Sequence, residues 1–494
     1  MLFNSIEFLI FFPVTVTVYF LIPDRIKYIW LLAASYFFYM QWNPAYVFLL
    51  LTSTVVTYSG ALILEKSDDD KKRKLCLFIA ILINLTILGY FKYSGLIMHY
   101  LYRGFSLAGI PFKPWDRDIL LPVGISFFTL QALGYLIDVY RRDIYAERNI
   151  LKYALFISFF PQLVAGPIER SKNLLKQLAT PHRFSYENLR RGLLVMLYGF
   201  FLKVVIADRI AIVVDEVYGD PASYPGFYIV FATLLFTLQI YCDFYGYSTI
   251  AKGAALTLGV RLMDNFNAPY YSGSIREFWR RWHISLSTWF RDYLYIPLGG
   301  NRKGRIRQYI NLMIVFAVSG LWHGASVSFI VWGLLHGFYQ VMGGIVKSVR
   351  TQVLKAAAKE DNEDSASFSD RMLRLVVTFV LVVFAWLFFR ANSMSNARNL
   401  LIHMTSTFNF TVLFDKSIYR LGVSQDYFNI LFISICLLAI VDRMKYKGKD
   451  VVEGFFRQRW WFRALAEVGL LLFILLYGCY GSAYDMQQFI YFQF

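Results

Sequence analysis

The sequence predicts an all-α polytopic membrane protein with about 11–13 transmembrane helices, and three observations support this prediction. The 494 residues are 57% hydrophobic and 19% aromatic, which is more apolar side chain than the core of a soluble protein of this length requires. Apolar runs of about 17–22 residues recur along the chain, and a helix of that length crosses roughly 30 Å of hydrocarbon. Short basic clusters separate many of these runs, as membrane topology requires.

The first apolar run, 6–22, is expected to be a retained span, because it has no basic leader and no small-residue cleavage pattern. The stretch 193–206 is also apolar but includes Lys203, so it is expected to be a span or a helix in the membrane interface. By length and hydropathy the expected spans are 6–22, 28–41, 45–64, 75–93, 119–139, 150–166, 227–246, 308–320, 326–346, 372–390, 428–442 and 462–481.

The net charge of +17 comes from short clusters between spans, which argues against a nucleic-acid partner and for a lipid bilayer. The basic clusters are 24–27, 68–74, 140–143, 301–307 and 443–449. Placing them in the cytoplasm predicts a multi-pass protein of the inner (cytoplasmic) membrane with both termini extracytoplasmic. In that arrangement the segments 94–118 and 392–426 are outer loops.

The whole chain, 1–494, is expected to form one transmembrane domain. N-terminal helices occupy 1–160 and C-terminal helices occupy 372–494, after a polar cytoplasmic linker at 347–371. Between them, 161–346 contains many Gly and Pro interruptions, which at membrane depth are tolerated only where the backbone lines a cavity or is buried in protein. We therefore expect a catalytic core here, with re-entrant or interfacial helices around a polar tunnel.

The stretch 275–291, IREFWRRWHISLSTWFR, is expected to be a basic amphipathic helix. At 100° per residue, Arg276, Arg280, His283, Ser287 and Arg291 share one face, and an apolar face contains Trp282. An interfacial helix whose arginines meet lipid headgroups is one interpretation. The histidine in line with the arginines favours a site for an anionic ligand, since guanidinium groups suit phosphate.

Two of the six histidines, His283 and His323, each follow a tryptophan, Trp282 and Trp322. His336 is as consistent with packing as with function. The four cysteines are expected to be small buried residues, and the sequence has no metal-ligand spacing, no nucleophile elbow and no phosphate-binding loop. What remains is an imidazole that takes a proton from a hydroxyl as that hydroxyl attacks an activated acyl group.

The segments that contain these residues resemble the membrane-bound O-acyltransferase family. They are QLVAGPIER, YCDFYGYS, NFNAPYYSGSIREFWRRWHISLSTWFRDYLYIPLGGNRKG and SGLWHGAS. The resemblance covers nearly the whole chain and is greatest to the branch that contains the bacterial alginate and peptidoglycan O-acetyltransferases. It implies a ring of helices around a tunnel, with His323 as the essential catalytic residue and His283 as its support. Gly320 and Gly324 are expected to break the helix at His323, about 20 Å into the membrane.

The resemblance also implies an acetyl thioester donor, expected to be acetyl-CoA, and no bound cofactor or metal. The acceptor would be an extracytoplasmic polysaccharide, or a secreted SGNH-like partner protein that relays the acetyl group. Together with the residue patterns it suggests a set of substrate-binding residues: Asp243, Tyr247, Arg276, Arg280, Trp282, Ser287, Arg291, Asp292 and Trp322.

Three alternatives are considered beside this prediction. Transfer of D-alanine to teichoic acid uses related motifs. A proton-coupled transporter or exporter would use intramembrane His and Asp residues as a relay, although the sequence has none of the internal repeats typical of that class. A scaffold that recruits lipids or a partner would explain the arginines but would leave both Trp-His pairs without a role.

Overall fold

The computed structural model describes residues 1–494 except 113–120, 357–366, 392, 481–489 and 491–494. Its regular secondary structure is helical, and no strand occurs among the described residues. The prediction of an all-α fold is confirmed. The chain forms two compact units, Met1–Phe200 with Tyr247–Met263, and Phe201–Gly246 with Asp264–Ile490.

The first unit is built from α1 to α9. In order these helices are α1 (Ile6–Leu21), α2 (Lys27–Met40), α3 (Val47–Lys66), α4 (Asp70–Leu107), α5 (Ile125–Tyr140), α6 (Ile150–Ser158), α7 (Phe160–Leu163), α8 (Ser171–Ala179) and α9 (Tyr186–Phe200). Side-chain caps start several of them: Asn149, for example, accepts from the backbone N–H groups of Leu151 and Lys152 at the start of α6. Helices α3 and α5 pack together, as do α2 and α6.

Two boundaries predicted for this unit are wrong. The expected outer loop 94–118 is helical as far as Leu107, because the apolar and aromatic residues after Lys92 continue α4 without a helix-breaking proline. The expected span 150–166 is not one helix. It divides at Phe159, whose ψ of 110° is not helical, and Pro161 then falls in the first turn of α7, where its missing N–H costs no hydrogen bond.

The second unit starts with a π-helical segment, Phe201–Ala207, and α10 (Asp208–Gly219). Helix α11 (Phe227–Thr257) begins in this unit and ends in the first. The later helices are α12 (Ile275–Arg281), α13 (Ile284–Phe290), α14 (Arg305–His323), α15 (Val327–Ala356), α16 (Phe368–Arg390), α17 (Met394–Ser406), α18 (Gln425–Tyr446), α19 (Val451–Phe456) and α20 (Trp460–Tyr477).

Seven helices in the described part of the chain are long and apolar enough to cross a membrane. They are Pro44–Lys66, Asp70–Leu107, Phe227–Thr257, Val327–Gln352, Phe368–Arg390, Gln425–Tyr446 and Trp460–Tyr477, and each overlaps an expected span. Two shorter apolar helices, α1 and α5, match two further expected spans. The polytopic membrane class is confirmed, and the total of about 11–13 spans stays a prediction.

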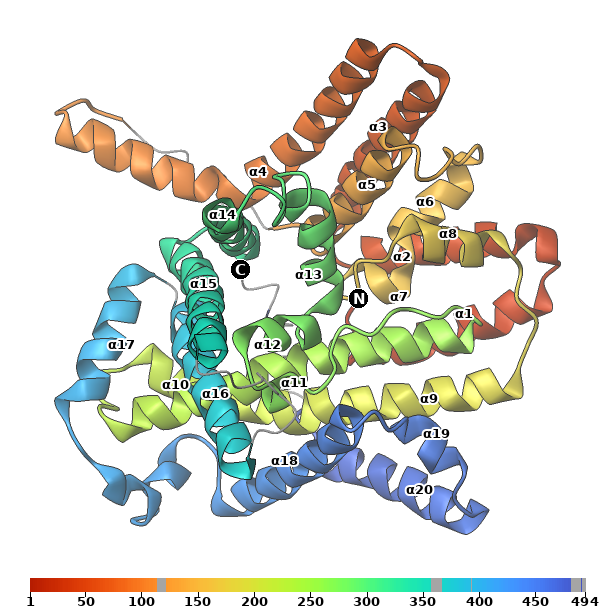
Figure 1. Cartoon of the computed structure of the whole chain (residues 1–494). Coiled ribbons are helices and arrows are strands. Elements are labelled where there is room, and N and C mark those ends of the chain that lie inside the picture. The colour runs from red at the N-terminus through yellow and green to blue at the C-terminus, as the bar shows by residue number, and fades with distance from the viewer. Residues whose placement is uncertain (113–120, 357–366, 392, 481–489, 491–494) are drawn as a thin grey trace. The chain divides into compact units, whose positions relative to one another are not determined.

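Helices α14, α15 and α16 pack in sequence in the second unit (Figure 1). A three-residue connection makes α14 and α15 an antiparallel hairpin, and glycines let their backbones approach closely. A Cβ atom on Gly320 would lie 2.3 Å from the carbonyl oxygen of Phe329, and one on Gly333 would lie 2.2 Å from that of Phe316. Only glycine fits at such a contact between helices.

Candidate active site

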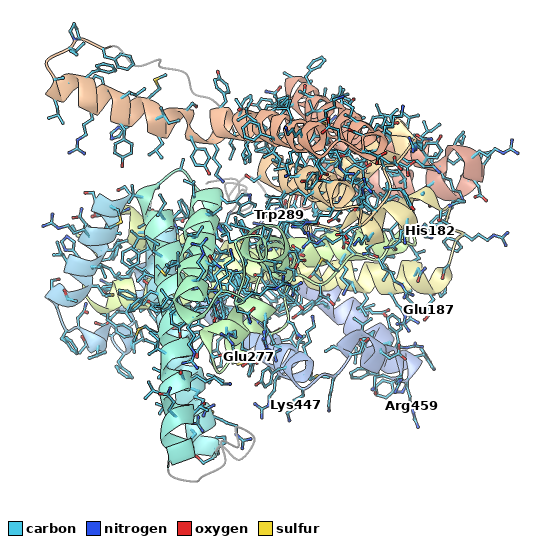
Figure 2. The ribbon with its side chains drawn as sticks, turned by 45° about the horizontal axis from the view of Figure 1, so that its top comes forward. His182, Glu187, Glu277, Trp289, Lys447 and Arg459 are labelled. Carbon is cyan, nitrogen blue, oxygen red and sulfur yellow. The ribbon has the colours of Figure 1, made fainter. Side chains whose placement is uncertain are left out.

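The segment that contains His283 is bent, so the prediction of one continuous helix over 275–291 is wrong. Helix α12 ends at Arg281 and α13 begins at Ile284, while Trp282 is extended and His283 is left-handed with φ 41° and ψ 56°. Figure 2 labels Glu277 on α12 and Trp289 on α13, which lie on the two arms of the bend. The polar face deduced at 100° per residue therefore does not exist across the bend.

The bend separates the arginines from the histidine. Arg276, Arg280 and Arg291 are exposed, whereas His283 is completely buried. Arg291 forms a 2.7 Å ion pair with Asp292. The Ser287 hydroxyl donates to the carbonyl oxygen of Trp282 across 3.3 Å, a local contact next to the bend. The sequence grouped these side chains on one face, and the structure divides them between a surface and an interior.

His283 is held by a residue that the sequence analysis did not select. Its Nδ1 lies 3.3 Å from Oδ1 of Asn265, and its ring makes an edge contact with Phe244 at 4.6 Å between centroids. Burial first, and the charge of His323 second, lower the pKa of His283, which lies outside the candidate spans. His283 is therefore neutral near pH 7.

His323 is the last residue of α14, and Gly324 follows as the extended C-cap. The predicted break is correct at Gly324 and wrong at Gly320, which lies inside the helix and serves the contact with α15. The His323 Nδ1 is 2.6 Å from the carbonyl oxygen of Ser319, one turn earlier. A carbonyl only accepts, so Nδ1 carries the hydrogen and, in the neutral ring, Nε2 carries the lone pair.

Aromatic rings surround His323 and link it to His283. The centroid of the His323 ring lies 4.9 Å from that of Trp322, 4.8 Å from that of Trp332 and 5.5 Å from that of Phe389. The Trp322 ring is also 6.3 Å from the ring of His283. The structure therefore brings the two Trp-His motifs together, with Trp322 in contact with both imidazoles.

His336, whose role the sequence left open, joins the same cluster. It is fully buried on α15, and its Nδ1 accepts a 3.3 Å hydrogen bond from Nε1 of Trp279. Its ring lies 5.2 Å from Trp332, which in turn contacts His323. Acceptance at Nδ1 places the hydrogen of the neutral ring on Nε2, the opposite tautomer to that of His323.

The remaining predicted residues make other contacts. Trp282 is buried among aromatic rings that include Phe278 and Trp386, at 5.4 and 5.0 Å between centroids. Asp243 forms a 2.7 Å ion pair with Lys203. Tyr247 belongs to the first unit, where its ring stacks on Phe3 at 4.5 Å.

Lys203 connects Asp243 to a second carboxylate, Asp208, at 2.8 Å, and all three side chains are at least 94% buried. The sequence analysis noted Lys203 as a charge in an apolar stretch but did not identify these partners: Asp208 begins the next helix, five residues on, and Asp243 lies on α11. No group of three His, Cys, Asp or Glu residues in the described part of the chain could hold a metal ion.

The fold and the buried pair of imidazoles define a membrane-embedded protein with a candidate acid–base site. Comparisons with known proteins give the family. The model of the MBOAT, membrane-bound O-acyltransferase family, matches residues 143–361. A probable alginate O-acetylase of Pseudomonas syringae is 38% identical over 399 residues, which cover 80% of this chain and 73% of the relative.

Two further relatives differ in the reaction that their names give. The peptidoglycan O-acetyltransferase of Helicobacter pylori is 35% identical over 439 residues, or 81% of this chain and 79% of the relative. The teichoic acid D-alanyltransferase of Streptococcus thermophilus is 27% identical over 294 residues, or 55% of this chain and 69% of the relative. The chain belongs to the membrane-bound O-acyltransferase family and is an O-acyltransferase.

Proposed function

We propose that this O-acyltransferase moves an acetyl group from a cytoplasmic thioester, expected to be acetyl-CoA, to a hydroxyl outside the cytoplasm. The acceptor is a hydroxyl of a polysaccharide, or of a secreted SGNH-like partner protein that passes the group on. The names of the relatives from Pseudomonas syringae and Helicobacter pylori support acetyl as the transferred group. The D-alanyltransferase matches less of the chain at lower identity, which favours acetyl over D-alanyl.

His323 acts as the general base, and the observation that carries this assignment is its 2.6 Å contact with the Ser319 carbonyl. That contact leaves the lone pair of the neutral imidazole on Nε2. In the proposed step His323 takes the proton of the acceptor hydroxyl while its oxygen attacks the thioester carbonyl. A C–O bond forms, the C–S bond breaks, and the thiolate leaves with the proton that His323 had accepted. No acyl-enzyme is formed.

The other candidate residues have supporting roles. His283 orients the thioester: with its Nδ1 facing Asn265 Oδ1, the neutral ring has a lone pair on Nε2 and no second N–H with which to stabilise the charge on the carbonyl oxygen. Trp322 packs between the two imidazoles. The exposed Arg276, Arg280 and Arg291 bind the phosphates of the donor. The other proposed substrate-binding residues are Tyr247, Trp282, Ser287, Asp292 and Asp243, of which Asp243 acts through its ion pair with Lys203.

The test is acetyl transfer by the purified full-length chain in lipid nanodiscs, with acetyl-CoA as donor and an O-acetylatable polysaccharide or the secreted partner as acceptor. His323→Ala removes the base, so we expect the rate to fall by a factor on the order of 10²–10⁴ or more. His403→Ala, on α17, is the matched control and should retain the wild-type rate.

Near-normal transfer by His323→Ala would exclude His323 as the base. A covalent acyl-enzyme trapped with labelled acetyl-CoA would contradict the direct mechanism while leaving the overall reaction intact. A chain that transfers D-alanine but not acetyl would place this protein with the teichoic acid enzymes.

A further inference from the structure

Asn265 lies directly against the bend that carries His283, and its side-chain oxygen has three donors. Only 3% of Asn265 is exposed. Its Oδ1 lies 3.3 Å from Nδ1 of His283, 3.2 Å from the backbone nitrogen of Ser285 and 2.8 Å from the hydroxyl of Ser285. One buried oxygen therefore serves both the imidazole and the first turn of α13.

The backbone around Asn265 holds the bend from both sides. The N–H of Ile284 donates to the carbonyl of Asn265, and the N–H of Asn267 donates to the carbonyl of Arg281, each at 3.0 Å. Between these two bonds His283 takes its left-handed conformation. Residues other than glycine rarely adopt this backbone conformation, and it persists only where surrounding contacts fix it.

We propose that Asn265 is a positioning residue for the transfer reaction, which fixes the tautomer and the orientation of His283 through the Oδ1–Nδ1 hydrogen bond. This inference rests on the proposed function. Because the amide oxygen can only accept, Nδ1 carries the hydrogen and Nε2 is the acceptor nitrogen of the neutral ring. In the opposite tautomer Nδ1 would present a lone pair to Oδ1, so the contact would be repulsive.

If Asn265 only stabilised the fold, its contacts with Ser285 and the backbone would be enough. The contact with the imidazole of His283 is the one that a positioning role requires. The elements packed around His283 contribute mainly aromatic groups, Phe244 from α11 and Trp322 from α14. The titratable group whose charge acts on His283 is His323 of α14. A charge introduced at Asn265 would therefore act on a buried imidazole that is neutral near pH 7.

Three variants of the full-length chain test the proposal. Asn265→Ala removes the acceptor. At metal sites, loss of the group that accepts a hydrogen bond from a histidine ligand typically costs about 10–100-fold, and we take the same range here. We expect kcat to fall by that factor with the KM for acetyl-CoA unchanged. Ser285→Ala is the matched control, because it removes another donor to the same oxygen but leaves His283 in place, and it should keep most of the wild-type kcat.

Asn265→Asp keeps an acceptor and adds a negative charge beside Nδ1, which raises the pKa of His283. The form of His283 with hydrogen on Nδ1 and a lone pair on Nε2 exists only in the neutral ring, so the proposed positioning is lost as the pH falls through the pKa of His283. In Asn265→Asp we therefore expect partial rescue of kcat at alkaline pH, with the acid limb of the pH profile moved to higher pH.

The tautomer is measured directly by ¹⁵N NMR of the chain labelled at histidine, with the His283 signals assigned by their loss in His283→Gln. This measurement needs no turnover, whereas wild-type acetyl transfer and its loss in His323→Ala test the proposed function separately. The Nδ1–H pattern in the wild type, altered in Asn265→Ala, supports the proposal. The opposite tautomer in the wild type overturns it.

The kinetic measurements test the positioning role independently of the NMR measurement. A wild-type kcat in Asn265→Ala, or an equal loss in Ser285→Ala, overturns the positioning role. Asn265→Ala could fail to fold, as judged by size-exclusion chromatography. In that case Asn265→Asp decides: a shifted acid limb supports the proposal, and a wild-type pH profile contradicts it.

Discussion

Among single residues outside the histidine cluster, Lys203 is a buried charge on which two carboxylates depend. Its ammonium group lies 2.8 Å from Asp208 and 2.7 Å from Asp243, and the cluster is almost completely buried. A hydrogen bond from the backbone N–H of Ile490 to Asp243 at 2.7 Å completes it. Buried charges persist only when they are paired in this way.

We predict that Lys203→Met destabilises the protein by about 3–5 kcal/mol, because two buried carboxylates lose their counter-charge. The measurement is thermal unfolding of the purified chain, together with its yield from membranes. Arg457→Met is the control: it breaks the exposed ion pair with Glu453, and such pairs contribute about 0–1 kcal/mol. Equal melting temperatures for the two variants would contradict the prediction.

At the scale of elements, the hairpin of α14 and α15 sets the position of His323. The helices approach at Gly320 and Gly333, where a Cβ atom would collide with backbone. The same helix, α15, also contains Gly343, around which no atom lies within 4 Å of an added Cβ. Of the four glycines in α15, Gly333 is therefore required by packing, whereas Gly343 is not.

We predict that Gly333→Ala forces α14 and α15 apart, lowers the melting temperature and reduces transfer activity. Gly343→Ala meets no clash, and alanine is favoured over glycine in a helix by up to about 1 kcal/mol, so it should be neutral or stabilising. Thermal unfolding and acetyl transfer are measured for both. A Gly333→Ala variant as stable as Gly343→Ala would show that the helices can separate at no cost.

The sequence predicted the positions of the helices better than the positions of the bends and breaks within them. Hydropathy predicted a span at 308–320, within α14, and the expected break at Gly324 is correct. It failed at 275–291 because the bend is caused by Asn265 and Asn267, which bond to the backbone of this segment from outside it. Helical periodicity depends only on the spacing of residues within a segment. It therefore does not reveal a bend that is imposed by hydrogen bonds from residues outside that segment. Asn265 could not be selected for the same reason.

At the scale of the whole molecule, hydropathy and charge were sufficient for the class. The apolar runs predicted every one of the seven long apolar helices described, since length and hydropathy are local properties. The ion pair between Lys203 and Asp243 and the contact between Trp279 and His336 join residues far apart in the chain, and no pattern in a single sequence reports them. Orientation in the membrane rests on the basic clusters alone.

We predict that α18 crosses the membrane with Gln425 outside and Lys447 in the cytoplasm. Its 22 residues span about 33 Å, and basic residues cluster at its C-terminal end. In a chain whose four cysteines are replaced by alanine and which retains activity, Gln425→Cys should react with an impermeant maleimide on intact spheroplasts. Lys447→Cys should react only after permeabilisation. The reverse pattern would invert the predicted topology.

The left-handed backbone at His283 gives this enzyme a conflict between stability and catalysis. Glycine and asparagine adopt that conformation more readily than histidine does. Either substitution would relax the bend and, by the same change, remove the imidazole from the site. Selection for a more stable chain alone would therefore move position 283 away from histidine. Keeping histidine there makes sense only for a protein selected for what the ring does.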